Sequence, residues 1–345
     1  MQVSEFDYHL PARLIAQHPL QQRDASRLMV IEHSSGRITH SQFRLLKDYL
    51  LPGDCLVAND VKVIPARLKG FKKDTKAKVE VLLLRILLEN CWEVLLKPAR
   101  RLREGTEIVF GEEMTGVVRK KSEGGIGVIE FQCRGTFAEG LRKLGEIPLP
   151  PYIREPLDDV SCYQTVYADK EGAAAASTAG LHFTKEAVEE IKKNGSEVVF
   201  VTLNVGLDTF QPVKTQLVED HRIHREYYRV SRESARSINR AIMDSRRIVA
   251  VGTTSVRVLE TVAVQDPGKG KWLVETKEGW TQLFIYPGYE FKAVDALLTN
   301  FHLPKSSLLM MVSAFAGKEL VMQAYRQAIQ ADYRFFSFGD CMLIL

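Results

Sequence analysis

The chain has 345 residues, of which 45% are hydrophobic and 26% are charged. This is the composition of an ordinary globular protein with enough chain for two domains. No stretch approaches the roughly 18 apolar residues of a membrane span, and the N-terminal MQVSEFDYHL lacks the basic start and apolar core of a signal peptide. We therefore expect a cytoplasmic protein with no membrane partner.

Five cysteines are scattered along the chain, and no two share the spacing of a metal site. Reduced thiols are the simplest interpretation, and a disulfide framework or a zinc knuckle is not expected. One H-x-x-H-x-E run, formed by His221, His224 and Glu226, resembles a ligand set. Its charged neighbours and the lack of a second cluster favour a solvated loop, so we expect no metal.

The net charge of +4 is unevenly distributed. Between Lys62 and Ser122 there are 15 Lys/Arg and 8 Asp/Glu, an excess of +7 that leaves −3 for the rest of the chain. Such a basic region suits a polyanion, although a solvated basic face gives the same count.

The first 64 residues have the pattern of a compact α/β segment. Arg27 to Glu32 is predicted as a strand, Ser41 to Leu51 as a helix, and Cys55 to Ala58 as a buried strand. The last strand ends at Asn59 and Asp60, and ligands in α/β sheets usually bind at strand carboxyl ends. A simple Asx turn is the alternative interpretation of these two residues.

Between Arg67 and Ile147 the pattern changes to short β runs separated by turns. The predicted strands are Lys78 to Arg85, Cys91 to Lys97, Thr106 to Phe110, Met114 to Lys121 and Gly127 to Cys133. Their close spacing predicts a small barrel, and its basic turns suit RNA. Aromatic residues for base stacking are few there (Phe71 and Trp92), so reading of a single strand by stacking is not strongly indicated.

A stiff Pro148-Leu-Pro-Pro-Tyr152 segment follows the predicted barrel and suits a hinge between domains. The predicted fold is therefore an α/β main domain, residues 1–65 and 153–345, with an inserted basic β-barrel domain, residues 66–152.

Two later strands run into polar segments. Glu197 to Leu203 is followed by Asn204, and Arg247 to Val251 is followed by the segment Gly252-Thr-Thr-Ser-Val-Arg257, which opens a helix. Backbone N–H groups and hydroxyls at a helix N-terminus favour an anion or ribose site. The glycine patterns of dinucleotide folds and of phosphate loops are both missing.

A run of small residues from Gly172 to Thr184 contains His182, which can transfer protons near neutral pH. It precedes a predicted helix from Lys185 to Lys193 with Thr184 as N-cap. A polar-ligand loop and a capping loop over an alanine-rich packing contact are both consistent with this pattern.

Further candidates follow in the C-terminal part. His302 lies in a polar loop after Thr299-Asn300, where a histidine is often functional. Asp340 is either an acid–base or hydroxyl-binding carboxylate or a turn residue. Gln282 to Tyr286 is predicted as a strand that ends in Pro287-Gly-Tyr289.

Taken together, these segments resemble one known family. STAGLHFT, VTLNVG, VGTTSVR, IYPGYEFK, VDALLTNFHLPKSSLLMMVSAFAG and YRFFSFGD, with NDVKVIPARL and PLPPYI upstream, resemble the S-adenosylmethionine:tRNA ribosyltransferase-isomerases of bacterial queuosine synthesis. The match is colinear from FDYHLP near residue 6 to Asp340, which is essentially the whole chain.

The resemblance implies an α/β body with an inserted barrel and an unusual reaction. The family transfers and isomerises the ribosyl part of S-adenosylmethionine onto 7-aminomethyl-7-deazaguanine in the tRNA wobble position. The product is epoxyqueuosine, and adenine and methionine are released. S-adenosylmethionine is thus a co-substrate, and we expect a monomer.

The chemistry of this reaction needs proton carriers and hydroxyl-binding groups, and we assign candidates for these roles as hypotheses. The candidates for proton transfer are His182, His302 and Asp340. The candidates for substrate binding are Asn59, Asp60, Arg67, Thr178, Gly180, Asn204, Gly252, Thr253, Thr254, Ser255, Arg257, Tyr286, Tyr289 and Asn300. The candidates for tRNA binding are Lys72, Lys73, Arg100, Arg101 and Arg103.

The chain departs from the family pattern at several positions. Ser177 stands where the family usually has Pro, Asn204 and Asp208 interrupt its L-H-V-G-x-G-T-F motif, and Val61-Lys62 replaces Thr-Arg in its N-D-T-R motif. Asn204 cannot transfer a proton at neutral pH. A catalytically impaired tRNA-binding homologue is therefore one alternative, and an RNA methyltransferase is another.

Overall fold

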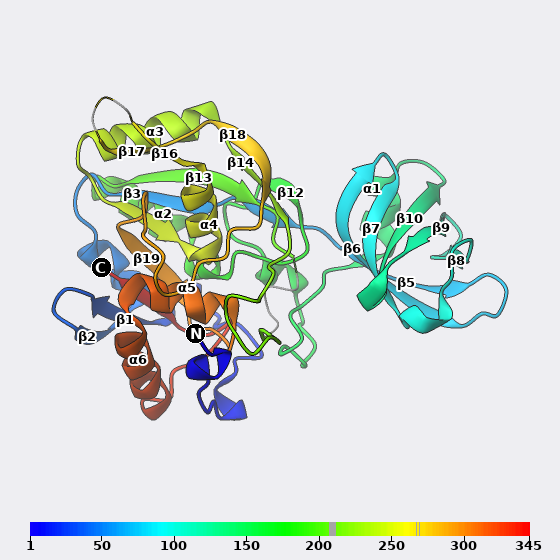
Figure 1. Cartoon of the computed structure of the whole chain (residues 1–345), viewed down its shortest axis with the longest axis horizontal. Helices are drawn as coiled ribbons and strands as arrows, with labels where there is room; N and C mark the ends of the chain where they lie inside the picture. Colours follow the sequence, from blue (N-terminus) through cyan, green and yellow to red (C-terminus); the bar gives the residue numbers. More distant parts are fainter. Residues whose placement is uncertain (207–211, 267, 269) are drawn as a thin grey trace. The chain divides into compact units, whose positions relative to one another are not determined.

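A computed structural model describes residues 1–206, 212–266, 268 and 270–345. The chain divides into two compact units, which are Met1–Lys62 with Pro150–Leu345 and Val63–Leu149 (Figure 1). The sequence-based limits, 65/66 and 152/153, each lie three residues beyond these boundaries (65 − 62 and 152 − 149).

A nine-stranded sheet organises the larger unit, in the order β18-β14-β13-β3-β15-β19-β20-β1-β2. Its neighbours β13, β3, β15 and β19 are parallel, and most of the other pairings are antiparallel. The strands are β1 (Arg27–Glu32), β2 (Arg37–Gln42), β3 (Cys55–Asn59), β13 (Glu197–Leu203), β14 (Glu226–Val230), β15 (Ile248–Val251), β18 (Lys277–Thr281), β19 (Ala296–Asn300) and β20 (Cys341–Ile344).

Helices pack against this sheet and bury its apolar residues. Helices α3 and α4 contact β3, β13 and β15 (Figure 1). A buried cluster joins Leu56 and Leu298 of the strands to Phe43, Leu46 and Ile191. The α-helices of this unit are α2 (Lys185–Lys193), α3 (Arg232–Met243), α4 (Gly252–Val262), α5 (Ser307–Ala316) and α6 (Lys318–Gln330).

Short elements complete the larger unit and the junction to the smaller one. The 3-10 helices are η1 (Val3–Phe6), η2 (Ala12–Leu14), η3 (Arg23–Ala25), η4 (Phe43–Tyr49), η7 (Val160–Tyr163) and η8 (Thr178–His182). The short strands are β4 (Val61–Val63), β12 (Lys170–Ala173), β16 (Ala263–Gln265) and β17 (Trp272–Val274). None of the helices described is long and apolar enough to cross a membrane.

The four parallel strands bring their carboxyl ends to one edge of the sheet. Asn59 ends β3, Leu203 ends β13, Val251 precedes α4, and Asn300 ends β19. The polar segments that follow these strands in the sequence therefore start from the same edge, the usual position of ligands in α/β sheets.

The smaller unit is a closed six-stranded barrel, because β5 pairs with both β6 and β8. Gly70 is needed for this closure, since a Cβ there would lie 2.6 Å from the Val109 carbonyl oxygen. The fold prediction of an α/β domain with a small barrel is confirmed. The elements are β5 (Arg67–Lys72), β6 (Lys78–Leu88), β7 (Cys91–Lys97), η5 (Ala99–Arg101), β8 (Glu107–Val109), β9 (Met114–Lys121), η6 (Glu123–Gly125), β10 (Ile126–Cys133), α1 (Phe137–Leu144) and β11 (Gly145–Glu146).

Two sequence-based element predictions are wrong. The strand expected at Gln282–Tyr286 lies earlier, at Lys277–Thr281, because its partner β14 begins at Glu226 and Glu226 pairs with Thr281. The helix expected at Ser41–Leu51 is the 3-10 helix η4, because Gln42 still pairs with β1. Strand β5 and helix α1 were not predicted, although Thr136 and Glu139 form a capping box at α1.

Candidate functional site

A small cavity lies at the carboxyl edge of the sheet, where the polar segments meet. It is narrow, because about 320 Å³ of space lies between its atoms, open solvent included, and only about 20 Å³ of this admits the centre of a water-sized molecule. Its lining residues are Ala176, Ser177, Thr178, Ala179, Val205, Gly252, Thr253, Thr254, Thr299, Asn300, His302 and Leu308. Five Ser or Thr residues, one amide and one imidazole thus surround a single space, which suits a ligand rich in hydroxyl groups.

Gly252 allows α4 to begin at this cavity. Its φ of +85° is one that side chains rarely adopt, and a Cβ there would lie 3.2 Å from Ser177 Oγ. One turn of helix then presents Thr253 and Thr254, and Thr254 Oγ1 hydrogen-bonds to Ser177 Oγ at 2.9 Å. The small-residue run and the GTTS segment therefore form adjoining walls of one cavity.

His302 lines the cavity from the loop after β19. Its Nε2 lies 2.9 Å from Thr299 Oγ1, and its backbone N–H donates to Tyr325 Oη at 2.8 Å. Its other ring nitrogen, Nδ1, has no hydrogen-bond partner within the described ranges of the chain. Burial lowers the pKa of His302 to about 3, so the ring is neutral at physiological pH.

His182 lies behind the cavity wall and is held on both sides. Asn300 Nδ2 donates to its Nε2 at 3.1 Å and to the Phe336 carbonyl, and His182 Nδ1 lies 2.8 Å from Ser26 Oγ. Because Nε2 accepts, the neutral ring carries its proton on Nδ1. Burial and nearby Arg23 lower the pKa of His182 to about 3.

His182 therefore orients a residue that does line the cavity. With both Nδ2 hydrogens donated, Asn300 Oδ1 accepts from Thr178 Oγ1 at 3.2 Å. The role of His182 as a proton carrier stays a prediction, and its contacts are those of a positioning residue.

Asp340 is buried away from the cavity lining. Its Oδ1 accepts from the Arg27 backbone N–H at 2.8 Å, and its Oδ2 accepts from the Arg334 backbone N–H at 2.8 Å and from Arg27 Nε at 3.2 Å. These contacts tie β1 to the segment before β20. They match the turn role that the sequence also allowed.

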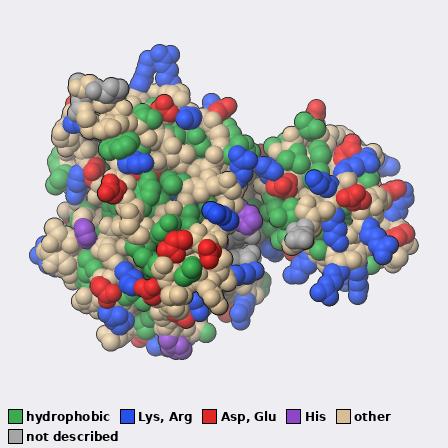
Figure 2. All heavy atoms as spheres, in the orientation of Figure 1, with side chains coloured by type: hydrophobic (Ala, Val, Ile, Leu, Met, Phe, Trp, Pro, Cys, Tyr) green, Lys and Arg blue, Asp and Glu red, His purple; other side chains and the backbone are tan. Residues whose placement is uncertain are grey.

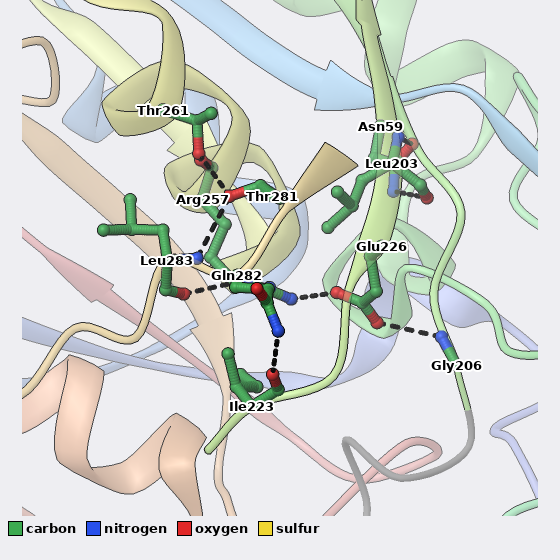
Figure 3. A network of polar contacts seen from close by, with 10 residues as sticks. All are labelled: Asn59, Leu203, Gly206, Ile223, Glu226, Arg257, Thr261, Thr281, Gln282 and Leu283. Carbon is green, nitrogen blue, oxygen red and sulfur yellow. Dashed lines mark hydrogen bonds and ion pairs between the residues drawn. The ribbon is translucent and has the colours of Figure 1, made fainter. Parts of the chain in front are cut away.

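Asn59 and Asp60 lie at the end of β3, and their side chains bond to the neighbouring strand. Asn59 donates to the Leu203 carbonyl at 3.0 Å and accepts from the Leu203 N–H group (Figure 3). It also accepts from the Val61 N–H group at 3.2 Å. Asp60 Oδ1 accepts from Thr202 Oγ1 at 2.7 Å, and burial raises the Asp60 pKa. Neither residue lines the cavity.

Arg257 forms a buried ion pair with Glu226 (Figure 3). Its Nε also donates to the Leu283 carbonyl at 3.2 Å, while Nη2 is buried with no partner among the residues the structure describes. Glu226 Oε1 accepts from the Gly206 N–H at 2.9 Å. The pair thus connects α4 to the segment that carries cavity residue Val205. Both carboxylate oxygens of Glu226 are bonded in this way, one to Arg257 and one to the Gly206 N–H.

The other predicted substrate residues have contacts outside the cavity. Ser255 Oγ donates back to the Val251 carbonyl at 2.8 Å, and Tyr289 Oη donates to buried Glu260 at 3.0 Å. Gly180 packs against the Tyr167 hydroxyl, and Asn204 packs against Gly172. The ring of Tyr286 lies against Phe284, and Arg67 belongs to the barrel unit. Their substrate contacts stay predictions.

Several cavity residues were missed from the sequence. Ser177 and Thr299 are adjacent to predicted residues Thr178 and Asn300, so extending each motif by one residue would have found them. Val205 and Leu308 carry no polar group, and no signal in the sequence marks them.

The barrel candidates for tRNA differ in their pairing. Lys72 bonds to Asp74 at 3.2 Å and Lys73 bonds to Glu107 at 2.5 Å. The others are exposed and, within the described ranges, make no ion pair: Arg100, Arg101 and Arg103. No cluster of three metal-type side chains occurs in the part of the chain that the structure describes.

The chain is similar to known proteins over almost its whole length. A family model described as "Queuosine biosynthesis protein" matches residues 3–344. The chain belongs to the queuosine biosynthesis protein family.

Relatives of this family member are similar over their whole length. Proteins named S-adenosylmethionine:tRNA ribosyltransferase-isomerase from Caldanaerobacter subterraneus subsp. tengcongensis and Thermoanaerobacter sp. are 53% and 52% identical over 100% of both chains. A crystal structure of S-adenosylmethionine tRNA ribosyltransferase from Thermotoga maritima is 41% identical, covers 99% of this chain and 100% of its own, and has a TM-score of 0.56.

The family departures fall at different distances from the cavity. Ser177 lines it and bonds to Thr254. Asn204 is the neighbour of cavity residue Val205, and its backbone N–H donates to the Tyr227 carbonyl at 2.9 Å. Asp208 lies outside the described residues. In this queuosine biosynthesis protein, one of the departures, Ser177, thus contributes a hydroxyl to the cavity.

Proposed function

We propose that the protein is an S-adenosylmethionine:tRNA ribosyltransferase-isomerase. It transfers and isomerises the ribosyl part of S-adenosylmethionine onto 7-aminomethyl-7-deazaguanine in tRNA, and it works in the cytoplasm as a monomer. The observation that carries this proposal is the cavity itself, where three motifs place five hydroxyl residues, Asn300 and His302 around one space. The names of the full-length relatives support the same reaction.

The chemistry requires a base, an acid and a site that excludes water. The sulfonium of S-adenosylmethionine acidifies the C5′ protons, so removal of one starts the loss of adenine. The amine of the nucleobase then attacks the ribose carbon chain, and the rearrangement closes an epoxide as methionine leaves.

The residues divide into those that bind and those that move protons. Thr253, Thr254 and Thr178 hold ribose hydroxyls: the Thr253 hydroxyl can donate and accept, Thr254 shares one hydrogen bond with Ser177, and Thr178, whose proton goes to Asn300 Oδ1, offers its oxygen as an acceptor. We assign proton acceptance to His302, because its ring lines the cavity and its Nδ1 is unused among the described contacts. His182 positions Asn300.

One incubation tests the proposal against both alternatives. The protein is mixed with S-adenosylmethionine and tRNA that contains the precursor base, and the small-molecule products are separated. Free adenine and methionine are expected. S-adenosylhomocysteine would instead identify an RNA methyltransferase, and neither product would identify a tRNA-binding homologue without catalysis.

A further inference from the structure

A wide hollow opens on the surface of the barrel unit. It has about 1360 Å³ of empty space, much of it open to solvent, and it lies between β5, β6 and the end of β7. Its lining residues are Lys69, Gly70, Phe71, Lys76, Lys78, Val79, Glu80, Lys97 and Pro98. Four of these nine residues are lysines, and Phe71, Val79 and Pro98 are apolar. The hollow therefore combines apolar side chains with positive charge.

Three of these lysines are not neutralised. Lys76, Lys78 and Lys97 are exposed and form no ion pair within the described ranges, whereas Lys69 bonds to Glu146 at 2.7 Å. Glu80 also lines the hollow and is 3.8 Å from Arg67 Nε. The local charge is therefore positive, and phosphate groups would neutralise it.

The excess of positive charge belongs to the barrel unit as a whole. Val63–Leu149 contains 17 Lys/Arg and 12 Asp/Glu, an excess of +5, which leaves −1 for the rest of the chain. Figure 2 shows many Lys and Arg side chains on the visible face of this unit. Many of them pair with acids elsewhere on the barrel, whereas the three unpaired lysines of the hollow, like Arg100, Arg101 and Arg103, make no ion pair within the described ranges and are available for a polyanion.

Phe71 supplies an aromatic surface inside the hollow. Its ring is partly exposed, and the Lys76 ammonium lies 4.9 Å from its centroid. Trp92, the other aromatic residue considered for stacking, is stacked on Phe137 with ring centroids 5.4 Å apart. Phe71 is therefore the one of the two that faces a hollow, which suits one stacked base rather than a row of them.

We propose that this hollow is an RNA-binding surface, with phosphates at Lys76, Lys78 and Lys97 and one base or sugar against Phe71. The proposal rests on the proposed function, which makes tRNA a substrate. It assigns RNA contacts to residues other than Lys72 and Lys73, whose charges are already paired with acids.

The test compares two triple variants of the full-length protein. One is K76A/K78A/K97A. The control, R85A/R119A/K143A, removes the same charge from the same unit at residues that are paired with acids. The Kd for precursor-containing tRNA is measured by filter binding from 50 to 300 mM NaCl, with thermal melting to check that both variants fold.

The hollow variant is expected to weaken binding at low salt at least tenfold and to reduce the slope of log Kd against log salt by about 2, since each phosphate contact contributes about 0.7 to 0.9. The control variant should change neither the Kd at low salt nor the salt slope by more than about a third of the change expected for the hollow variant. F71L, which keeps an apolar side chain, should raise Kd about tenfold with the slope unchanged.

Equal slopes for the hollow variant and the control would overturn the proposal. Because Kd is measured without turnover, this outcome is separate from the proposed function. A wild-type protein that binds tRNA but releases no adenine would contradict the proposed ribosyltransferase activity. The RNA-binding surface would still be tested by the salt slopes of the two triple variants.

Discussion

The two buried histidines differ in which ring nitrogens the protein already uses. His182 is bonded through both nitrogens, to Asn300 and to Ser26. His302 is bonded through Nε2 to Thr299, and it lines the cavity. A residue that transfers a proton needs a nitrogen within reach of substrate, so His302 is the better candidate for the proton acceptor that we propose.

Replacing His302 by Gln should lower single-turnover adenine release by roughly 10²- to 10⁴-fold, the usual contribution of a general base. Binding of S-adenosylmethionine should change much less, because the glutamine retains a polar group at the cavity. His40→Gln is the matched control, since His40 bonds to Tyr333 Oη and does not line the cavity. Near-full activity of His302→Gln would place the base elsewhere.

Among the elements, η8 shows how a motif glycine can serve packing. A Cβ on Gly180 would lie 2.2 Å from Tyr167 Oη and 2.7 Å from Thr165 Cγ2. Tyr167 Oη is itself buried and has no hydrogen-bond partner among the described residues. The glycine therefore makes room for a tyrosine beside the cavity wall.

Gly180→Ala should lower the free energy of unfolding by about 1–3 kcal/mol, because the added methyl group overpacks the site. Tyr167→Phe removes the nearest obstructing atom and should be close to neutral alone. The double variant should recover part of the lost stability in urea unfolding. Additive effects of the two changes would show that the Tyr167 hydroxyl is not the obstacle.

The Arg257–Glu226 ion pair joins α4 to β14, and Glu226 also accepts a hydrogen bond from the Gly206 N–H. Leu at either position alone should cost about 3–5 kcal/mol of stability, since it leaves an unpaired buried charge. The double variant R257L/E226L should recover most of it, because apolar pairs often replace buried ion pairs at little cost.

Activity distinguishes positioning from stability in the same variants. In R257L/E226L the Gly206 N–H loses its acceptor, so kcat should stay at least tenfold below wild type even though the melting temperature recovers. Full recovery of both would mean that the pair only stabilises the fold.

At the scale of the whole molecule, the buried histidines make stability depend on pH. Burial holds the pKa of His182 and of His302 at about 3, against about 6.5 in an unfolded chain. Between these values the unfolded state binds more protons, so stability falls as the pH falls through this window.

From pH 6.5 to pH 5 each histidine should cost about 2 kcal/mol of stability. Urea unfolding at pH 7 and pH 5 measures this for the wild type and for a His182→Asn/His302→Gln variant. The variant should lose about 4 kcal/mol less between the two pH values than the wild type loses. If the variant and the wild type lose the same stability between pH 7 and pH 5, the two histidines do not gain protons on unfolding in this range.

Patterns with strong local causes were predicted well. The limits of α2 and β13 agree with the sequence-based ranges, because an N-cap at Thr184 and a continuous apolar run define them. The cavity residues Thr178, Thr253, Asn300 and His302 also stand in recognisable segments. Gln282–Tyr286 failed because strand pairing, rather than propensity, decides where β18 ends.

The class of fold, the basic insertion and the motifs that carry the family resemblance could all be predicted from the amino-acid sequence. These follow from periodicity, charge and short-range turn chemistry, which act within a few residues. Which of the motif residues meet at the cavity depends on how the distant segments fold together. Asp340, Asn59 and Arg257 bond to partners far away in the chain, and pairing of buried polar groups depends on that three-dimensional proximity.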